Sequence, residues 1–302
     1  MRSLVDLVRR ERGEAVPKEH LKLSSSTEAF FRTDRPHDGP VIVVYHLQKT
    51  AGTALRHVVR ANLPPSEVEI LPDLRSLRHA PRELAEWYGQ WYDSLGSDRR
   101  ERLCCVMSHL AGFLLPALDR PAEALVLIRE PVDRTISYYH VKRRRRDPEK
   151  PMRSLAEIYA GDPARRGLRS ESWEQFFNWQ SRCLLSVFHD VSALPSSEGP
   201  SPDAALWRER LREVVERVYL VGVQDRFSEY VDSLAVRFGW QVFVRKSKVN
   251  PNRPTVSEIS PGLRETIRAY NWLDAELYEL ARAAQERREA EHAASEADSA
   301  SA

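Results

Sequence analysis

A short apolar run followed by a basic, glycine-containing turn constrains the fold of this 302-residue chain more than any other segment. Residues Val41–Tyr45 predict a short strand, and residues Ala54–Leu63 predict a helix. Between them stands the turn Lys49-Thr50-Ala51-Gly52-Thr53. This order places backbone N–H groups at a helix N-terminus, where the helix dipole favours an anion. The sequence therefore predicts a phosphate-binding turn.

The side chains of this turn support the same interpretation. Lys49 adds a positive charge, Thr50 and Thr53 add hydroxyl donors, and Gly52 lets the backbone approach a ligand closely. The turn is not a Walker A loop, because that motif has its lysine after the second glycine, whereas Lys49 precedes Gly52. A nucleotide ligand fits this pattern, but ATP or GTP hydrolysis is poorly supported. The alternative is a capped helix with an incidental lysine.

A second segment lies about eighty positions downstream. Residues 124–128 form a continuous apolar run, as expected for a strand covered on both faces of a parallel sheet. Arg129 follows at the carboxyl end of this strand, where open α/β sheets bind ligands, and Ser137 lies about two turns into the next helix. A guanidinium and a hydroxyl together can hold one phosphate. The alternative is an ion pair of Arg129 with Glu130 or Asp133.

Together the two segments resemble the cofactor signature of sulfotransferases that use 3′-phosphoadenosine 5′-phosphosulfate (PAPS). The resemblance is closest to the family of heparan sulfate 2-O- and 6-O-sulfotransferases (sulfotransferase family 2). It implies an α/β, P-loop-like three-layer αβα fold with a central, mostly parallel sheet and helical additions. It also implies transfer of a sulfuryl group from PAPS to an acceptor hydroxyl on a carbohydrate or a small molecule, without a metal.

The resemblance assigns roles to particular residues. A loop similar to the Lys49 turn holds the 5′-phosphosulfate, and an arginine and a serine like Arg129 and Ser137 hold the 3′-phosphate. A late basic loop closes over the nucleotide in this family. The implied cofactor-binding residues are Lys49, Thr50, Ala51, Gly52, Thr53, Ala54, Arg129, Ser137, Lys248 and Arg253.

The match extends beyond these loops but is not complete. Three further segments look like parts of the family: Asn178–Arg182, Val218–Phe227 and Asn271–Tyr278. Within the first of them, Gln180 and Arg182 either lie near the active site or pack a helix. The family usually has proline, a second glycine and serine where this chain has Gln48, Ala51 and Ala54.

Sulfuryl transfer needs a base for the acceptor hydroxyl, and histidine is suited to this because it titrates near neutrality. His109 is the best placed, since it follows the apolar run of residues 103–107 at a predicted strand-to-loop junction. In the related enzymes a histidine just after the corresponding strand looks like the base. His46 is the second candidate, and a structural role for His109 is the alternative. Lys49 is the other catalytic candidate, stabilising charge on the leaving bisphosphate.

Two other classes of function remain open. A P-loop nucleotide-binding kinase or NTPase would use Lys49 and Thr50 on phosphate, but it also needs a strand-end acidic residue for magnesium. Neither predicted strand end, at residues 107–108 or 128–129, provides one. The third class is a non-catalytic nucleotide binder on the same fold. The sequence contains no H-E-x-x-H motif and no spaced pair of CxxC motifs that would indicate a metal site.

Whole-chain properties indicate a soluble, cytoplasmic enzyme. The formal net charge is only +2, so no global field favours nucleic acid. The three cysteines do not form a disulfide framework and predict buried free thiols in a reducing compartment. No segment reaches the roughly eighteen apolar residues that a membrane span needs. The acceptor and the oligomeric state cannot be deduced from the sequence.

The predicted organisation has three parts: an N-terminal extension at residues 1–38, a sulfotransferase domain at residues 39–284 and a flexible C-terminal tail at residues 285–302. A predicted helix near residues 81–96 carries four aromatic residues, which either pack in the core or line an acceptor sugar. The basic run Lys142–Arg146 is either a solvated helix end or a surface that attracts an anionic acceptor.

Overall fold

A computed structural model of the chain describes residues 39–71, 81–145, 153–160, 174–192, 194, 199–200, 202–241 and 253–301. Three features predicted from the sequence lie outside these residues: the extension at residues 1–38, Lys248, and Arg146 at the end of the basic run.

The centre of the fold is a sheet of five parallel strands. Their order is β2-β3-β1-β4-β5, so β1 lies between β3 and β4. After β1 the chain crosses to one edge and returns, and it then continues on the other side of β1. Such a reversal leaves a crevice at the carboxyl ends of the strands, where α/β folds bind ligands. The strands are β1 (Val41–Tyr45), β2 (Val68–Ile70), β3 (Cys105–Ser108), β4 (Ala122–Ile128) and β5 (Tyr219–Val223).

The continuous apolar run of β1 fills two separate cores. All five of its residues are buried. Because successive side chains of a strand point to opposite faces, Val43 and Tyr45 pack in one core while Ile42 and Val44 pack in the other. The same division applies to β4. A sheet with an apolar core on each face must be covered by helices on both sides.

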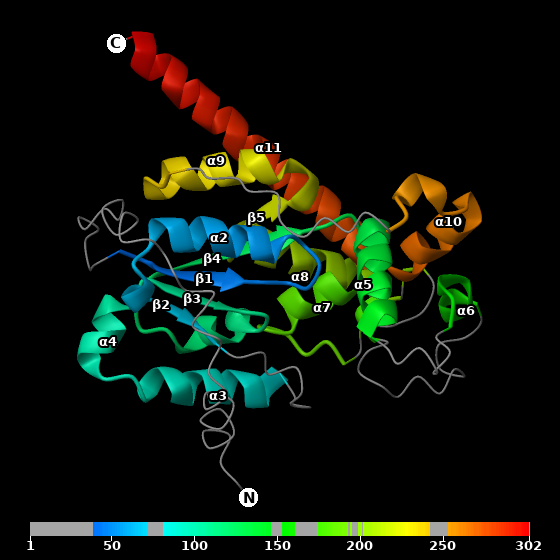
Figure 1. Ribbon diagram of the computed structural model, residues 1–302, viewed down its shortest axis with the longest axis horizontal. Coiled ribbons are helices and arrows are strands. Elements are labelled where there is room, and N and C mark those ends of the chain that lie inside the picture. Colours follow the sequence, from blue (N-terminus) through cyan, green and yellow to red (C-terminus); the bar gives the residue numbers. More distant parts are fainter. Residues whose placement is uncertain are drawn as a thin grey trace, which may run out of the picture.

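The helices cover the sheet in that way (Figure 1). On one face lie α2 (Gly52–Asn62) and α9 (Phe227–Phe238). The other face is covered by α3 (Pro81–Asp93), η5 (Ala111–Ala117), α7 (Trp179–Leu185), α8 (Ala204–Arg217) and α11 (Trp272–Ser301). The predicted α/β class, with a three-layer αβα arrangement around a parallel sheet, is confirmed.

A third apolar cluster forms a helical addition at one end of the sheet (Figure 1). It joins α5 (Pro131–Arg145), α6 (Leu155–Tyr159), η7 (Glu174–Phe176), η9 (Val256–Glu258) and α10 (Pro261–Tyr270). Aromatic rings hold it together, with Tyr159 in contact with Phe176, Phe177 and Tyr270. The remaining short helices are η3 (Pro65–Glu67), α4 (Ser97–Arg102) and η8 (Gln224–Arg226).

The structure decides between the two interpretations of the aromatic residues on α3. Trp87, Tyr88 and Tyr92 are buried members of the main core, so they serve packing and do not line an acceptor. Trp91 is partly buried at the edge of that core. The hydroxyl of Tyr88 lies 2.7 Å from that of Ser108, at the end of β3.

The C-terminal helix differs from the expected flexible tail. The boundary predicted at residues 284–285 falls inside α11, which continues to Ser301. Gln285 is fully buried, and its Oε1 accepts a hydrogen bond of 2.8 Å from the N–H of Val223 at the end of β5. Its Nε2 donates to the carbonyl of Arg226. The start of the predicted tail is therefore part of the folded domain.

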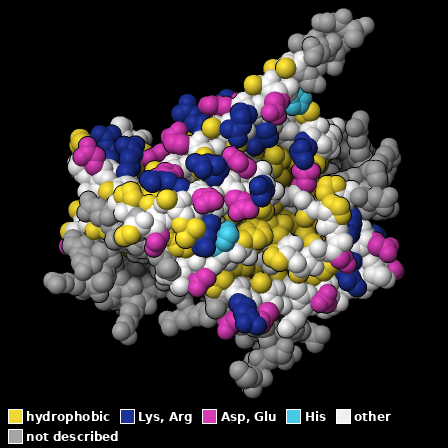
Figure 2. Space-filling view, turned by 180° about the vertical axis from the view of Figure 1, so that it is seen from behind, with side chains coloured by type: hydrophobic (Ala, Val, Ile, Leu, Met, Phe, Trp, Pro, Cys, Tyr) yellow, Lys and Arg dark blue, Asp and Glu magenta, His cyan; other side chains and the backbone are white. Residues whose placement is uncertain are grey.

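The rear face in Figure 2 carries basic and acidic side chains intermixed, beside apolar ones. Cys104, Cys105 and Cys183 are buried, as predicted, and burial raises the pKa of Cys183 to about 12. Within the described ranges, none of the helices is both long enough and apolar enough to cross a membrane.

Candidate functional site

The turn after β1 has an unusual backbone. Lys49 and Ala51 both adopt positive φ angles, of 73° and 67°, although neither is glycine. Between them Thr50 is buried, and its hydroxyl donates a 2.9 Å hydrogen bond to the carbonyl of Leu47. The Thr50 hydroxyl thus closes the turn, whereas the sequence predicted that it contacts phosphate. Residues held in left-handed conformations cost energy and concentrate at binding sites.

The turn leads into a helix N-terminus that has no side-chain cap. Ala54 and Leu55 both donate their N–H groups to the carbonyl of Ala51, at 2.8 and 3.2 Å. The N–H of Ala54, a predicted cofactor contact, is therefore already used. Within the described part of the chain, no backbone carbonyl accepts from the N–H groups of residues 51–53. These groups are the ones that a helix start offers to an anion.

Gly52 is required for a reason that the sequence did not suggest, in addition to the predicted approach of a ligand. A Cβ atom at this position would lie 1.7 Å from Cδ2 and 2.2 Å from Nε2 of His46. The glycine therefore makes room for the imidazole of His46. As a result, His46 lies directly against the first residue of α2, next to the anion-binding turn.

We predict that Gly52→Ala destabilises the protein by about 1–3 kcal/mol, because the added methyl group forces the His46 ring out of its position. The free energy of unfolding, measured by urea denaturation, checks this value. Ala51→Gly is the matched control, since it changes the adjacent residue by the same methyl group. Glycine accepts the left-handed conformation of Ala51, so this variant should be neutral or more stable by up to about 1 kcal/mol. Equal destabilisation by both variants would contradict the explanation.

The two candidate bases are neighbours. His109 is the first residue after β3, and its Nδ1 donates a 2.6 Å hydrogen bond to the backbone carbonyl of His46. The two imidazole rings lie 4.3 Å apart between centroids. A carbonyl can only accept, so the proton of the neutral His109 ring is on Nδ1 and the lone pair is on Nε2. This tautomer has a basic nitrogen on the side of the ring away from the His46 carbonyl.

Arg129 joins the second segment to the turn. Its Nη1 donates a 2.9 Å hydrogen bond to the carbonyl of Lys49, across a separation of 80 residues. The peptide of Arg129 is held by Gln180, which accepts from the Arg129 N–H at 2.9 Å and donates to its carbonyl at 2.8 Å. The structure therefore brings Arg129 and the Lys49 turn together at the carboxyl ends of β4 and β1.

Arg129 also forms the ion pair that the sequence left as an alternative. Its Nε and Nη2 lie 2.7 and 2.6 Å from Oδ2 of Asp133, one turn into α5. Burial lowers the pKa of Arg129, and the charge of Asp133 opposes this shift. The other oxygen of Asp133, Oδ1, lies 2.6 Å from Nη2 of Arg253. One carboxylate thus holds two arginines from distant parts of the chain.

Ser137 lies on the same face of α5 as Asp133, because residues four apart on a helix are neighbours. Its side chain is 7% exposed. Arg253 approaches the same turn of α5 and donates from Nη1 to the carbonyl of Asp133 at 3.0 Å. Arg129 and Arg253 therefore meet at Asp133, and Ser137 lies one turn further along α5, while Lys248 lies outside the described residues.

The basic run at the end of α5 adds positive charge near Arg253. Burial lowers the pKa of His140, and the charges of Arg143, Arg253 and Arg144 lower it further. The Nζ of Lys142 lies 5.5 Å from the ring centroid of Tyr138. Lys142 is half-buried, whereas Arg143 and Arg144 are exposed, so the described part of this run is a solvated helix end, and its attraction for an anionic acceptor stays a prediction.

Reciprocal caps of α7 and α11 were not predicted from the sequence. Asp274 accepts from the N–H of Ser181 at 2.7 Å and of Gln180 at 3.1 Å, at the start of α7. Asn178 in turn accepts from the N–H groups of Leu273 and Asp274, at the start of α11. These caps fix Gln180, which holds the peptide of Arg129. The polar residues of segments 178–182 and 271–278 could be recognised in the sequence. The sequence did not indicate that these two segments pair with each other.

Gln180 and Arg182 therefore have different roles. Gln180 lies at the site, whereas the guanidinium of Arg182 donates to the carbonyls of Phe177, Val191 and Leu194 and supports local packing.

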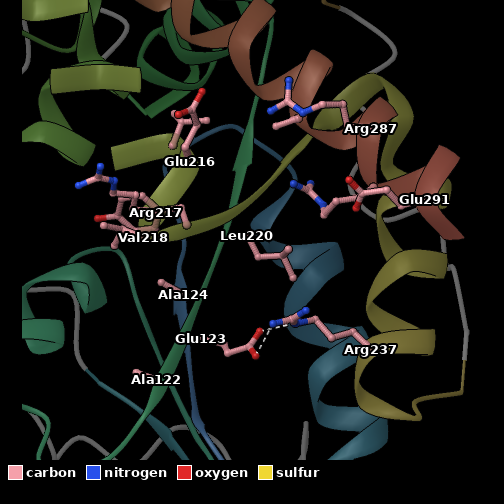
Figure 3. Close-up of a pocket in the computed structure, with 14 residues that line it drawn as sticks. Ala122, Glu123, Ala124, Glu216, Arg217, Val218, Leu220, Arg237, Arg287 and Glu291 are labelled. Atoms are coloured by element: carbon pink, nitrogen blue, oxygen red, sulfur yellow. Dashed lines mark hydrogen bonds and ion pairs between the residues drawn. The ribbon is translucent and has the colours of Figure 1, made fainter. Parts of the chain in front are cut away.

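A hollow of about 400 Å³ lies elsewhere, at the amino ends of β4 and β5 (Figure 3). Its lining includes Arg237, which pairs with Glu123, and three residues of α11, Arg287, Arg288 and Glu291. It does not include the residues at the carboxyl ends of the strands. Among the described residues, no group of three or more His, Cys, Asp or Glu side chains is arranged to hold a metal ion.

A comparison of the sequence with known protein families finds no match, and a comparison with curated proteins finds none. Among solved structures, the chain is similar to a sulfotransferase from Alicyclobacillus acidocaldarius, with 16% sequence identity and a TM-score of 0.42. The similarity covers 82% of this chain and 99% of that chain. A functional assignment must therefore come from the residues of the site.

Proposed function

We propose that this protein is a PAPS-dependent sulfotransferase of the EC 2.8.2 type. One observation carries the proposal: the hydrogen bond from Arg129 to the carbonyl of Lys49 joins the two segments that are predicted to bind anions, at the carboxyl ends of β4 and β1. PAPS has phosphate groups at two places, on its 5′ and 3′ positions. A ligand of this kind needs two anion sites that are separated by the length of a nucleoside. One site is expected at a helix N-terminus and the other at an arginine cluster.

The residues present fit such a ligand. The uncapped start of α2 supplies N–H donors from residues 51–53 and the charge of Lys49 for the 5′-phosphosulfate. Arg129 after β4, Ser137 on α5 and Arg253 before η9 provide two guanidinium groups and a hydroxyl for the 3′-phosphate. An arginine has five N–H donors, so the contacts of Arg129 with Asp133 and Lys49 leave donors for a ligand.

The proposed mechanism gives each residue one task. His109 Nε2 accepts the proton of the acceptor hydroxyl as the hydroxyl oxygen forms its bond to sulfur. The bond between sulfur and the bridging oxygen of the 5′-phosphate breaks at the same time. Lys49 and the N–H groups of residues 51–53 stabilise the negative charge that develops on that oxygen. The hydrogen bond from His109 Nδ1 to His46 supports this assignment, because it keeps the lone pair on Nε2.

The experiment uses the full chain with sulfur-labelled PAPS and pools of carbohydrate and small-molecule hydroxyl acceptors. The expected result is label transfer, with a product heavier by one sulfuryl group, and formation of adenosine 3′,5′-bisphosphate. Parallel reactions contain labelled ATP and magnesium. Phosphoryl transfer in these reactions would favour a kinase or NTPase instead.

A binding measurement by calorimetry separates the remaining outcomes. Adenosine 3′,5′-bisphosphate should bind more tightly than adenosine 5′-monophosphate, because only the former reaches both anion sites. Tight bisphosphate binding without transfer to any acceptor would favour a non-catalytic nucleotide binder. Equal affinities for the two nucleotides would contradict the proposed function.

A further inference from the structure

We propose that Asp133 is a positioning residue that organises Arg129 and Arg253 into one receptor for a single phosphate group. This inference rests on the proposed function and adds a residue to its 3′-phosphate site. Asp133 contacts the two arginines with different oxygens, Oδ2 for Arg129 and Oδ1 for Arg253. The carboxylate thereby holds the two guanidinium groups on either side of itself.

The geometry explains why this position needs a fixed carboxylate. Arg129 belongs to the end of β4, whereas Arg253 lies 120 residues after Asp133 in the chain. Arg253 makes two contacts with this residue, one to the side chain and one to the backbone carbonyl. The described contacts of the Arg253 guanidinium are thus with Asp133 alone. Without the carboxylate, half of these contacts would be lost.

Asp133 itself is held in position. Its N–H donates a 2.8 Å hydrogen bond to Oε2 of Glu130, at the start of α5. The side chains of Asp133 and Arg253 are 22% and 20% exposed, and that of Arg129 is 15% exposed. Partly buried ion pairs are screened less by solvent than exposed ones, so the arrangement is well defined.

The charge balance leaves the cluster attractive to an anion. Two guanidinium groups and one carboxylate give a net charge of +1. Asp133 therefore stabilises the close approach of two cations without neutralising both. A phosphate group has enough acceptor oxygens to bind the donors that Asp133 leaves unused.

The opposite role would be that Asp133 competes with phosphate for the two arginines. The two roles predict opposite effects of Asp133→Asn, which keeps the shape of the side chain and removes its charge. As a positioning residue, Asp133 strengthens phosphate binding, so the variant should bind phosphate less well. As a competitor, it weakens binding, so the variant should bind phosphate more tightly.

The test compares the affinities of Asp133→Asn and the unchanged protein for adenosine 3′,5′-bisphosphate and adenosine 5′-monophosphate, by calorimetry. We expect the preference for the bisphosphate to fall on the order of tenfold or more, with little change for the monophosphate. A general loss of structure would weaken the binding of both nucleotides equally. The ratio of the two affinities therefore measures the contribution of the 3′-phosphate site. The melting temperature shows whether the variant is folded.

Asp232→Asn is the matched control. It makes the same chemical change at an exposed residue of α9, a helix that packs in a different apolar cluster from α5. The ratio of affinities should not change in this variant. If Asp133→Asn does not fold, Arg253→Met removes the other half of the ion pair and should lower the same ratio.

Each outcome has a distinct meaning. An unchanged or increased preference for the bisphosphate in Asp133→Asn would overturn the positioning role. If the unchanged protein has no preference between the two nucleotides, the proposed function itself fails before the variant is considered. A reduced ratio in Asp133→Asn, together with an unchanged ratio in Asp232→Asn, supports the inference.

Discussion

Lys49→Met should lower the rate of PAPS-dependent transfer by two to three orders of magnitude, which is the usual effect of removing one donor that stabilises a developing negative charge. Methionine has a similar length and no charge, so the variant removes the cation and little else. Lys49 already adopts a left-handed backbone conformation, and methionine meets the same steric cost there. The loss should therefore come from the chemical step and not from the shape of the turn.

Single-turnover transfer from labelled PAPS measures this loss, and calorimetry with adenosine 3′,5′-bisphosphate measures ground-state binding separately. Arg60→Met is the matched control, because it removes a positive charge from the last turn of α2, the helix that follows the Lys49 turn. Its transfer rate should stay within about twofold of the unchanged protein, as expected for a single charge that is distant from the site. A Lys49→Met variant that transfers sulfate at the normal rate would exclude Lys49 from the mechanism.

The parts of the fold that could be predicted are those encoded by local sequence pattern. Continuous apolar runs at residues 41–45 and 124–128 identified two strands that the structure buries at the centre of the sheet. The position of Arg129 at a strand end followed directly from the second run. A parallel sheet covered on both faces leaves this signature because no residue of its central strands faces water.

The roles of individual side chains in the turn could not be predicted in the same way. Gly52 was predicted from the sequence to approach a ligand, and the structure shows that it also makes room for His46, whose position depends on the packing of β1 against β3. The Thr50 hydroxyl appeared to be a ligand donor, whereas it bonds to Leu47. Both roles depend on three-dimensional neighbours, and residue type alone does not specify them.

Long-range pairings had no signal in the sequence. The sequence suggested Asp133 as one partner of Arg129, but nothing indicated that Arg253 shares it. Gln285 is another case, because a polar residue in a polar segment indicates a solvated tail, yet this one accepts from the last residue of β5. In the sequence, a buried glutamine that accepts from a backbone N–H cannot be distinguished from a glutamine on the surface, because its hydrogen-bond partner is distant in the chain.

The second large effect is expected for His109→Asn. The side-chain amide of asparagine can replace Nδ1 as the donor to the His46 carbonyl, but it has no basic nitrogen in the place of Nε2. If His109 is the base, the rate constant for transfer should fall by two to four orders of magnitude. Affinity for adenosine 3′,5′-bisphosphate and the melting temperature should change little, because the structural hydrogen bond is kept.

The matched comparison is His46→Asn, which changes the neighbouring imidazole of the stacked pair. This variant keeps the backbone carbonyl that orients His109, so it should lower the rate much less. A base of the imidazole type must be neutral to act, so the rate of the unchanged protein should fall on acidification below neutral pH. His109→Asn should lose this dependence, whereas His46→Asn should keep it. The reverse pattern, with the larger loss and the missing pH dependence in His46→Asn, would assign the base to His46, because that ring lies against the start of α2.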